Sequence, residues 1–152
     1  MPLSASQIPI VANVIKSGVG VLTGTTIGTL GSNTNGVTIY TAGSAGGRVI
    51  SLMASTNDTV TINVYLYILR GSTVVPIGLV NIPLSSGNTN AARFPVDFLN
   101  GTNLPGLPID NTGRQYIPLI ANDVLRATTI ANLSSTPTAA SAWLTAHCAD
   151  YQ

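Results

Sequence analysis

Apolar and polar residues alternate along several short stretches of this chain, which is the pattern of β-strands with one buried face. The clearest alternation covers residues 60–70, where Val, Ile and Leu are separated by Thr, Asn and Tyr. A second alternating stretch covers residues 48–56. The Asn–Asp pair at positions 57–58 has turn chemistry, so we expect these two strands to form a hairpin.

A Gly–Ser pair at positions 71–72 is a second turn signal, and it leads into a strand predicted at residues 73–84. The three strands together predict a meander. Pro76 and Pro83 cannot donate to a strand ladder, so the third strand is expected at an edge or interrupted. Further strands are predicted at residues 20–30, 37–41, 91–98, 116–120, 124–130 and 139–149, with an Asn–Asp turn at 122–123.

About eight short strands separated by turn signals predict an all-β protein, a two-sheet sandwich of jelly-roll-like form. An immunoglobulin-like sandwich has the same alternating pattern and stays open as an alternative. The chain has 152 residues, which is the length of one domain. We expect an N-terminal arm at residues 1–17 and a single sandwich domain at 18–152.

The first seventeen residues do not follow the strand pattern, because their apolar side chains are spaced irregularly among small polar ones. Three of them, at positions 11, 14 and 15, would share a helical face, but the segment is too short to hold a helix alone. It is expected to dock on its own domain or on a neighbour. The candidate protein-contact residues are Ile8, Ile10, Val11, Val14 and Ile15.

Residues 99–113 are loop-like in sequence yet carry four large apolar side chains. Pro105, Gly106 and Pro108 follow one another closely in this segment. Proline restricts the backbone, and the apolar side chains need a surface to cover. We therefore expect an ordered cap over one end of the sandwich.

Charge is the unusual part of the composition. Only 7% of residues are charged, against about 25% in typical soluble domains. Ser, Thr and Asn occupy the polar positions instead, and such a surface associates readily. The net charge of +1 offers no electrostatic attraction for nucleic acid. Nucleic acid is therefore not expected as a partner. No apolar run approaches the roughly 18 residues of a spanning helix, so a membrane is not expected as a partner either.

The chain offers few candidates for catalysis or metal binding. Its one histidine, His147, directly precedes its one cysteine, Cys148, so in a strand the two side chains point to opposite faces. One His and one Cys fall short of a zinc ligand set. The five acids, all Asp, are widely separated at positions 58, 97, 110, 123 and 150. No catalytic residue, metal or cofactor is expected, although a hydrolase whose Asp residues converge in space stays a further alternative.

The segment 96–129 contains a distinctive set of residues: Leu–Pro–Gly–Leu–Pro–x–Asp at 104–110, Gly113, Tyr116–x–x–Leu119, Asp123 and Leu125. In these residues it resembles a family of small structural proteins of tailed bacteriophages. The likeness covers residues 47–131, and the N-terminal arm and last strand lie outside it. Many relatives have Gly before the Asp of the penultimate turn, where this chain has Asn122, a residue that tolerates the same left-handed backbone.

This resemblance implies a virion component, a decoration or cement protein on the capsid surface that is made in the cytoplasm of the host bacterium. The implied partners are the major capsid protein and further copies of the chain, with a homotrimer favoured. The alternative is a receptor- or carbohydrate-binding module of a phage tail or fibre. Its possible sugar-stacking residues are Trp143, Tyr40, Tyr65, Tyr67 and Tyr116.

Overall fold

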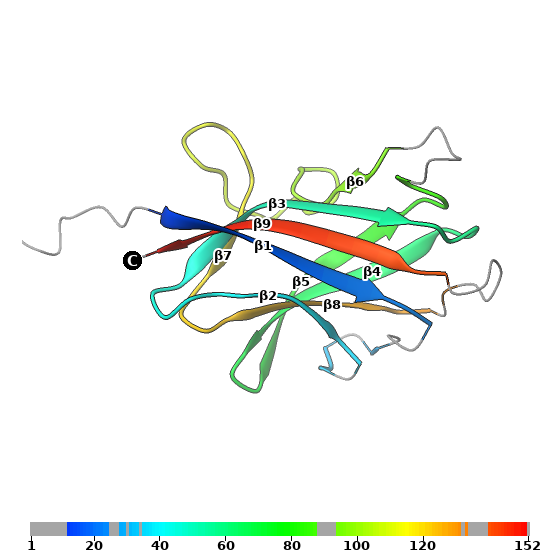
Figure 1. The fold of residues 1–152 in the computed structure, drawn as a ribbon, viewed down its shortest axis with the longest axis horizontal. Helices are drawn as coiled ribbons and strands as arrows, with labels where there is room; N and C mark the ends of the chain where they lie inside the picture. The colour runs from blue at the N-terminus through cyan, green and yellow to red at the C-terminus, as the bar shows by residue number, and fades with distance from the viewer. Residues whose placement is uncertain are drawn as a thin grey trace, which may run out of the picture.

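The computed structural model of the chain describes residues 12–24, 28–29, 31–33, 35–87, 94–131, 133 and 140–151. The described part is all-β and forms two antiparallel sheets (Figure 1). Among these residues there is no helix of the length and apolar character needed to cross a membrane. The strands are β1 (Ala12–Leu22), β2 (Val37–Thr41), β3 (Gly47–Thr56), β4 (Ile62–Arg70), β5 (Thr73–Ile82), β6 (Val96–Asp97), β7 (Ile117–Leu119), β8 (Val124–Thr129) and β9 (Ala142–Tyr151).

The strand pairings are nested along the chain. β1 pairs with β9, β2 with β8, β3 with both β6 and β7, and β4 with β5. One sheet therefore has the order β1-β9-β3, with β6 and β7 on the far side of β3, and the other has the order β2-β8-β4-β5. The prediction of an all-β, two-sheet sandwich is confirmed.

The inward-facing residues of both sheets form one hydrophobic core. Alternate positions of the central strands are buried because successive side chains of a strand point to opposite faces. Each large aliphatic side chain buried in this way contributes about 1.5–3 kcal/mol. The residues at the centre include Leu52, Ala54, Val64, Leu66, Leu125, Ala127, Leu144 and Ala146.

The side of the sandwich next to β5 is closed by the segment that follows β6. Phe98, Leu99 and Leu104 of this segment are buried in the core. Leu104 lies against β5 at Gly78, where an added Cβ would come within 2.6 Å of the leucine side chain. The predicted ordered cap is therefore confirmed for its first half, whereas Ile109 is 63% exposed.

The predicted hairpin between residues 48–56 and 60–70 is wrong. These strands are β3 and β4, and they belong to different sheets, so the three-stranded meander is wrong as well. The polar groups of the connection bond to other loops: the amide of Thr56 donates to the Ser86 carbonyl, and the Asn57 side chain accepts from the Ser141 amide. Because those partners lie outside the connection, it crosses between the sheets instead of closing a hairpin.

The second predicted turn does form a hairpin. Arg70 of β4 is opposite Thr73 of β5, and Gly71 between them has a φ of 61°, a backbone that glycine adopts without strain. β5 is the edge strand of its sheet, as expected for a strand that contains proline. The register shifts between the pairs Leu66–Gly78 and Tyr67–Pro76, so the proline sits beside a bulge.

The N-terminal strand differs from the prediction. A strand was expected at residues 20–30 and an arm or helical face before it, but β1 covers Ala12–Leu22 and pairs with β9 from Val14 onward. Val14 and Ile15, expected in the arm, are strand residues that pair with Asp150 and Ala149 of β9. Val11 lies outside the described residues. In the described part of the strand predicted at 91–98, only β6 is a strand. The other predictions agree better: β2, β7, β8 and β9 lie within a few residues of their predicted bounds.

Candidate interaction surface

The outer face of the β1-β9-β3 sheet carries several of the exposed large apolar side chains of the described chain. Figure 1 looks onto this sheet, with β9 between β1 and β3. The pairing register places the outward side chains in rows across the three strands. We call this surface the β1-β9-β3 face. Its residues are Ile15, Ser17, Val19 and Val21 of β1, Trp143, Thr145, His147 and Ala149 of β9, and Arg48, Ser51, Met53 and Ser55 of β3.

The face is apolar and hydroxyl-bearing, and none of its residues is acidic. Ile15 is 66% exposed and Val19 58% exposed; Ile15 lies opposite Ala149 of β9, and Val19 lies opposite Thr145. Trp143 lies at the other end, opposite Val21. Isolated exposed apolar residues are ordinary, but several gathered on one sheet face mark an interaction site.

Part of the opposite face of the sandwich is covered by the chain itself. Tyr65 and Tyr67 on the outer side of β4 are buried, with their rings stacked at 5.3 Å. The connection between β1 and β2 lies over them: the Tyr65 hydroxyl accepts from the Gly31 amide at 3.3 Å, and the Tyr67 hydroxyl donates to Asn33 Oδ1 at 3.2 Å. Within the described chain, the β1-β9-β3 face therefore keeps several apolar side chains exposed, whereas the outer face of the other sheet is covered at these two tyrosines and exposed at Leu79 of β5.

The structure places two of the five predicted contact residues. Val14 is 36% exposed near the start of β1, and Ile15 belongs to the β1-β9-β3 face. Ile8, Ile10 and Val11 lie outside the described residues. The sequence interpretation missed Val19 and Val21, although the alternation of residues 15–21 is a signal for one common face; it named Trp143 only as a possible sugar-stacking residue.

The aromatic residues proposed as sugar platforms divide into two groups. Tyr40, Tyr65 and Tyr67 are buried in the sandwich, so they are unable to stack on a ligand. Trp143 is 39% exposed on the β1-β9-β3 face. Tyr116 is half-buried next to this face, with the Arg48 guanidinium 5.8 Å from the centre of its ring.

Three of the five carboxylates stabilise turns. Asp58 accepts the amide of Val60, and Asp97 accepts the amide of Leu99. Asp110 accepts the Thr112 hydroxyl at 2.7 Å and the amides of Thr112 and Arg114. Such side-chain to backbone bonds two or more residues ahead are typical of structural Asp residues.

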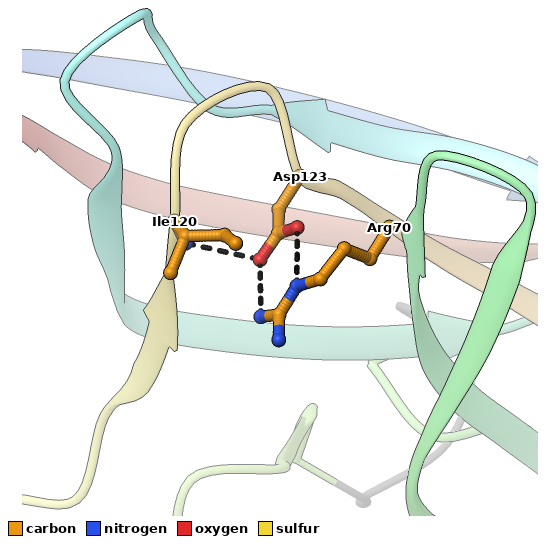
Figure 2. A network of polar contacts seen from close by, with 3 residues as sticks. All are labelled: Arg70, Ile120 and Asp123. Atoms are coloured by element: carbon orange, nitrogen blue, oxygen red, sulfur yellow. Dashed lines mark hydrogen bonds and ion pairs between the residues drawn. The ribbon is translucent and has the colours of Figure 1, made fainter.

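The other two carboxylates are buried, and each forms an ion pair with a cation that reaches solvent. Burial by itself raises the pKa of Asp123, but hydrogen bonds from Arg70 and from the Ile120 amide outweigh it and hold the pKa below its usual value (Figure 2). Asp150 behaves in the same way. Burial raises its pKa, but Lys16 at 2.6 Å and the Tyr40 hydroxyl outweigh burial and hold the pKa below its usual value. Both acids are thus ionised structural groups.

The described residues do not assemble a hydrolytic triad. His147 is exposed and Cys148 is buried on the opposite side of β9, as the strand pattern predicted. The Ser17 hydroxyl lies 3.3 Å from Nδ1 of His147, but a triad also needs a carboxylate bonded to the imidazole, and none of the described ones is. No three His, Cys or Asp side chains gather into a possible metal site within the described ranges.

Comparisons of the chain with protein-family models, with curated proteins and with solved structures find no match. Its function is therefore inferred from the fold and from the β1-β9-β3 face.

Proposed function

We propose that this chain is a non-enzymatic viral structural protein, a decoration or cement protein that binds the outer surface of a phage head and stabilises it. The observation that carries the proposal is the bare β1-β9-β3 face, an exposed sheet surface of apolar and hydroxyl side chains without an acid. The phage assignment also draws on the resemblance of residues 96–129 to phage structural proteins.

The chemistry of the face suits a protein partner. A standard interface buries about 800 Å² on each side, and its core is poor in charge. Exposed Ile15 and Val19 release ordered water when covered, and their hydroxyl-bearing neighbours lose little on desolvation compared with charged groups. Many copies on one shell would add their separate contacts into a high avidity.

Two of the sheet edges, β1 and β5, are poor sites for association, which favours binding through the face. At the β1 edge, Lys16 is ion-paired with the buried Asp150, and the register is irregular between Ala12 and Val14. At the β5 edge, Pro76 sits beside a bulge. Charged residues that point inward, bulges and prolines are the devices that prevent strand addition at sheet edges.

The nested strand pairing supports a jelly-roll topology, in which a long antiparallel ribbon wraps into two sheets. Jelly rolls occur in viral capsid and lectin domains, so this argument favours a virion role by analogy of fold alone. In this proposal the partners are the major capsid protein and further copies of the chain, in a homotrimer, and the protein is located on the capsid surface after synthesis in the bacterial cytoplasm.

One observation favours the alternative of a receptor- or carbohydrate-binding module of a tail or fibre. Trp143 is 39% exposed on the face, and exposed aromatic rings serve as platforms for apolar sugar surfaces. Saturable binding of the protein to particular glycans on an array, without binding to phage heads, would favour this alternative.

The proposal is tested by adding the purified protein to phage heads that lack it and measuring co-sedimentation and resistance of the heads to heat. Val19→Asp places a charge in the centre of the face and is expected to weaken binding at least tenfold. Leu79→Asp is the matched control, because Leu79 is 44% exposed on β5 of the other sheet. Heads whose heat resistance is the same with and without the protein would contradict the cement function.

A further inference from the structure

Two arginines have side chains with no hydrogen-bonded or ion-paired partner in the part of the chain that the structure describes. Lys16 is paired with Asp150, Arg70 with Asp123, and Arg126 donates to Asn33 and to the Gly36 carbonyl. Arg48 and Arg114 are the other described cations. Both line one hollow of about 510 Å³ at the Ile15 end of the β1-β9-β3 face.

The volume of this hollow lies within the 300–1,000 Å³ that is usual for small-molecule sites. Its wall combines the two arginines with uncharged hydrogen-bonding groups and with apolar surface. The hydrogen-bonding groups are Ser51, Thr112, Gln115 and His147, and the apolar side chains are Ile15 and Ile50.

Arg48 is held in place by an aromatic contact, which leaves its hydrogen-bonding capacity unused. Its guanidinium lies 5.8 Å from the centre of the Tyr116 ring, a cation–π contact that uses the flat face of the group. The edge of a guanidinium is a planar fork of N–H donors that matches a carboxylate. The Nε atom of Arg48 is buried without an acceptor, so the present partners do not satisfy this side chain.

The charge of the hollow fits a monoanion. Asp110 also lines it, and the hydrogen bond from the Thr112 hydroxyl and the bond from the Arg114 amide keep the pKa of this carboxyl below its usual value. The carboxylate therefore offsets one of the two arginine charges. The remaining positive charge balances one carboxylate, whereas a phosphate dianion would leave an excess of negative charge beside Asp110.

We propose that this hollow binds an acidic monosaccharide, with its carboxylate on Arg48 and Arg114 and its hydroxyls on the uncharged polar groups of the wall. The sugar class follows from the combination of one anion site with several hydroxyl, amide and imidazole groups and with the apolar Ile15 and Ile50. An acidic protein side chain would use the arginines alone. This site goes beyond the proposed function, because attachment to a shell requires no sugar.

The test is an NMR titration of the full chain with D-glucuronate and with N-acetylneuraminate, followed through the backbone amides. D-glucose, acetate, glutamate and inorganic phosphate are the comparison ligands. We expect saturable shifts at residues 48, 114–116 and 147 with one or both acidic sugars, and at least tenfold weaker binding in Arg48→Gln and Arg114→Gln. Arg48→Lys, which keeps the charge but lacks the fork, is expected to bind more weakly than the wild type.

Ser72→Asp is the charge-matched control, because it lowers the net charge by the same amount in the exposed β4–β5 turn. It should bind the sugar as the wild type does. The proposal is overturned if neither acidic sugar binds, or if glucose or phosphate binds as tightly as the acidic sugars. It is also overturned if acetate and glutamate bind as tightly as the acidic sugars, a result that would indicate a docking site for an acidic side chain. Arg114 is exposed, so Arg114→Gln remains a folded test even if Arg48→Gln is unstable.

Discussion

Arg70 and Asp123 form a two-bond ion pair that ties the end of β4 to the turn before β8. Nε and Nη2 of the arginine lie 3.0 and 2.8 Å from the two carboxylate oxygens (Figure 2). The same carboxylate accepts the Ile120 amide at 3.0 Å. Because Asp123 is buried while Arg70 reaches solvent, the aspartate holds both the turn and the arginine in place.

Replacement of Asp123 by Asn is expected to lower the free energy of unfolding by about 2 kcal/mol, the usual worth of hydrogen bonds to a charged group. The asparagine side chain retains one acceptor oxygen, so the two-bond pairing with Arg70 is lost. Urea unfolding measures the change. The control is Asp97→Asn at an exposed turn carboxylate, which should change stability by less than about 0.5 kcal/mol; equal losses in both variants would contradict a special role for the ion pair.

Stability is expected to fall in acid because the pKa values of Asp123, Asp150 and Asp110 are lowered in the folded chain. Below an unfolded pKa of about 3.9, the unfolded chain binds more protons than the folded one. The contribution of these groups is therefore complete above that pKa and is lost as the pH falls through the lower folded values.

The measurement is the urea midpoint at a series of pH values. We expect it to stay level between about pH 5 and 7 and to decline below about pH 4. In Asp123→Asn the decline should be shallower, since one of the titrating groups is gone. A midpoint that rises as the pH is lowered from 4 to 3 would show that the sign of these shifts is wrong.

Gly18 is expected to resist substitution. A Cβ at this position would overlap the backbone carbonyl oxygen of Ile39 in β2, and backbone moves less readily than a side chain. Gly18→Ala should cost about 1–3 kcal/mol, as overpacking usually does. Gly101→Ala is the matched control because nothing lies within 4 Å of its added Cβ. In thermal unfolding, Gly18→Ala should have a lower midpoint temperature than Gly101→Ala.

The Cys148 thiol is expected to be inert in the folded protein. Burial, together with the nearby Asp150 carboxylate, raises its pKa to about 12. Since the thiolate is the reactive form, a thiol reagent such as DTNB at pH 8 should label the native chain far more slowly than the chain in denaturant. Rapid labelling of the native protein would show that this end of β9 opens readily.

The amino-acid pattern alone was enough to predict most strands and the sandwich class. β4 alternates along its length, and Gly71 marks a turn whose conformation depends on neighbouring residues only. Local alternation does not say which sheet a strand joins. For this reason the pattern predicts a hairpin at Asn57–Asp58, whereas in the structure the Asn57 side chain accepts from the Ser141 amide and the Asp58 carbonyl accepts from the Ser85 amide after β5.

The candidate site depended more on tertiary structure. In β1 the valines Val19 and Val21 face outward, while Gly18 and Gly20 face the interior. A pattern-based assignment would place the larger apolar residues inside. The glycines face inward because β2 lies so close that Ile39 occupies the space of their side chains.

What the sequence determined by itself is the secondary structure, the scarcity of charge and the lack of a local catalytic motif, because each depends on residues that are neighbours in the chain. Tertiary structure decided which surface is bare. The β1–β2 connection covers Tyr65 and Tyr67 through long-range bonds to Asn33 and Gly31, and no local pattern specifies such a contact. Within the described residues, the apolar Ile15 and Val19 of the β1-β9-β3 face stay exposed, whereas the β1–β2 connection lies over the two tyrosines of the other sheet.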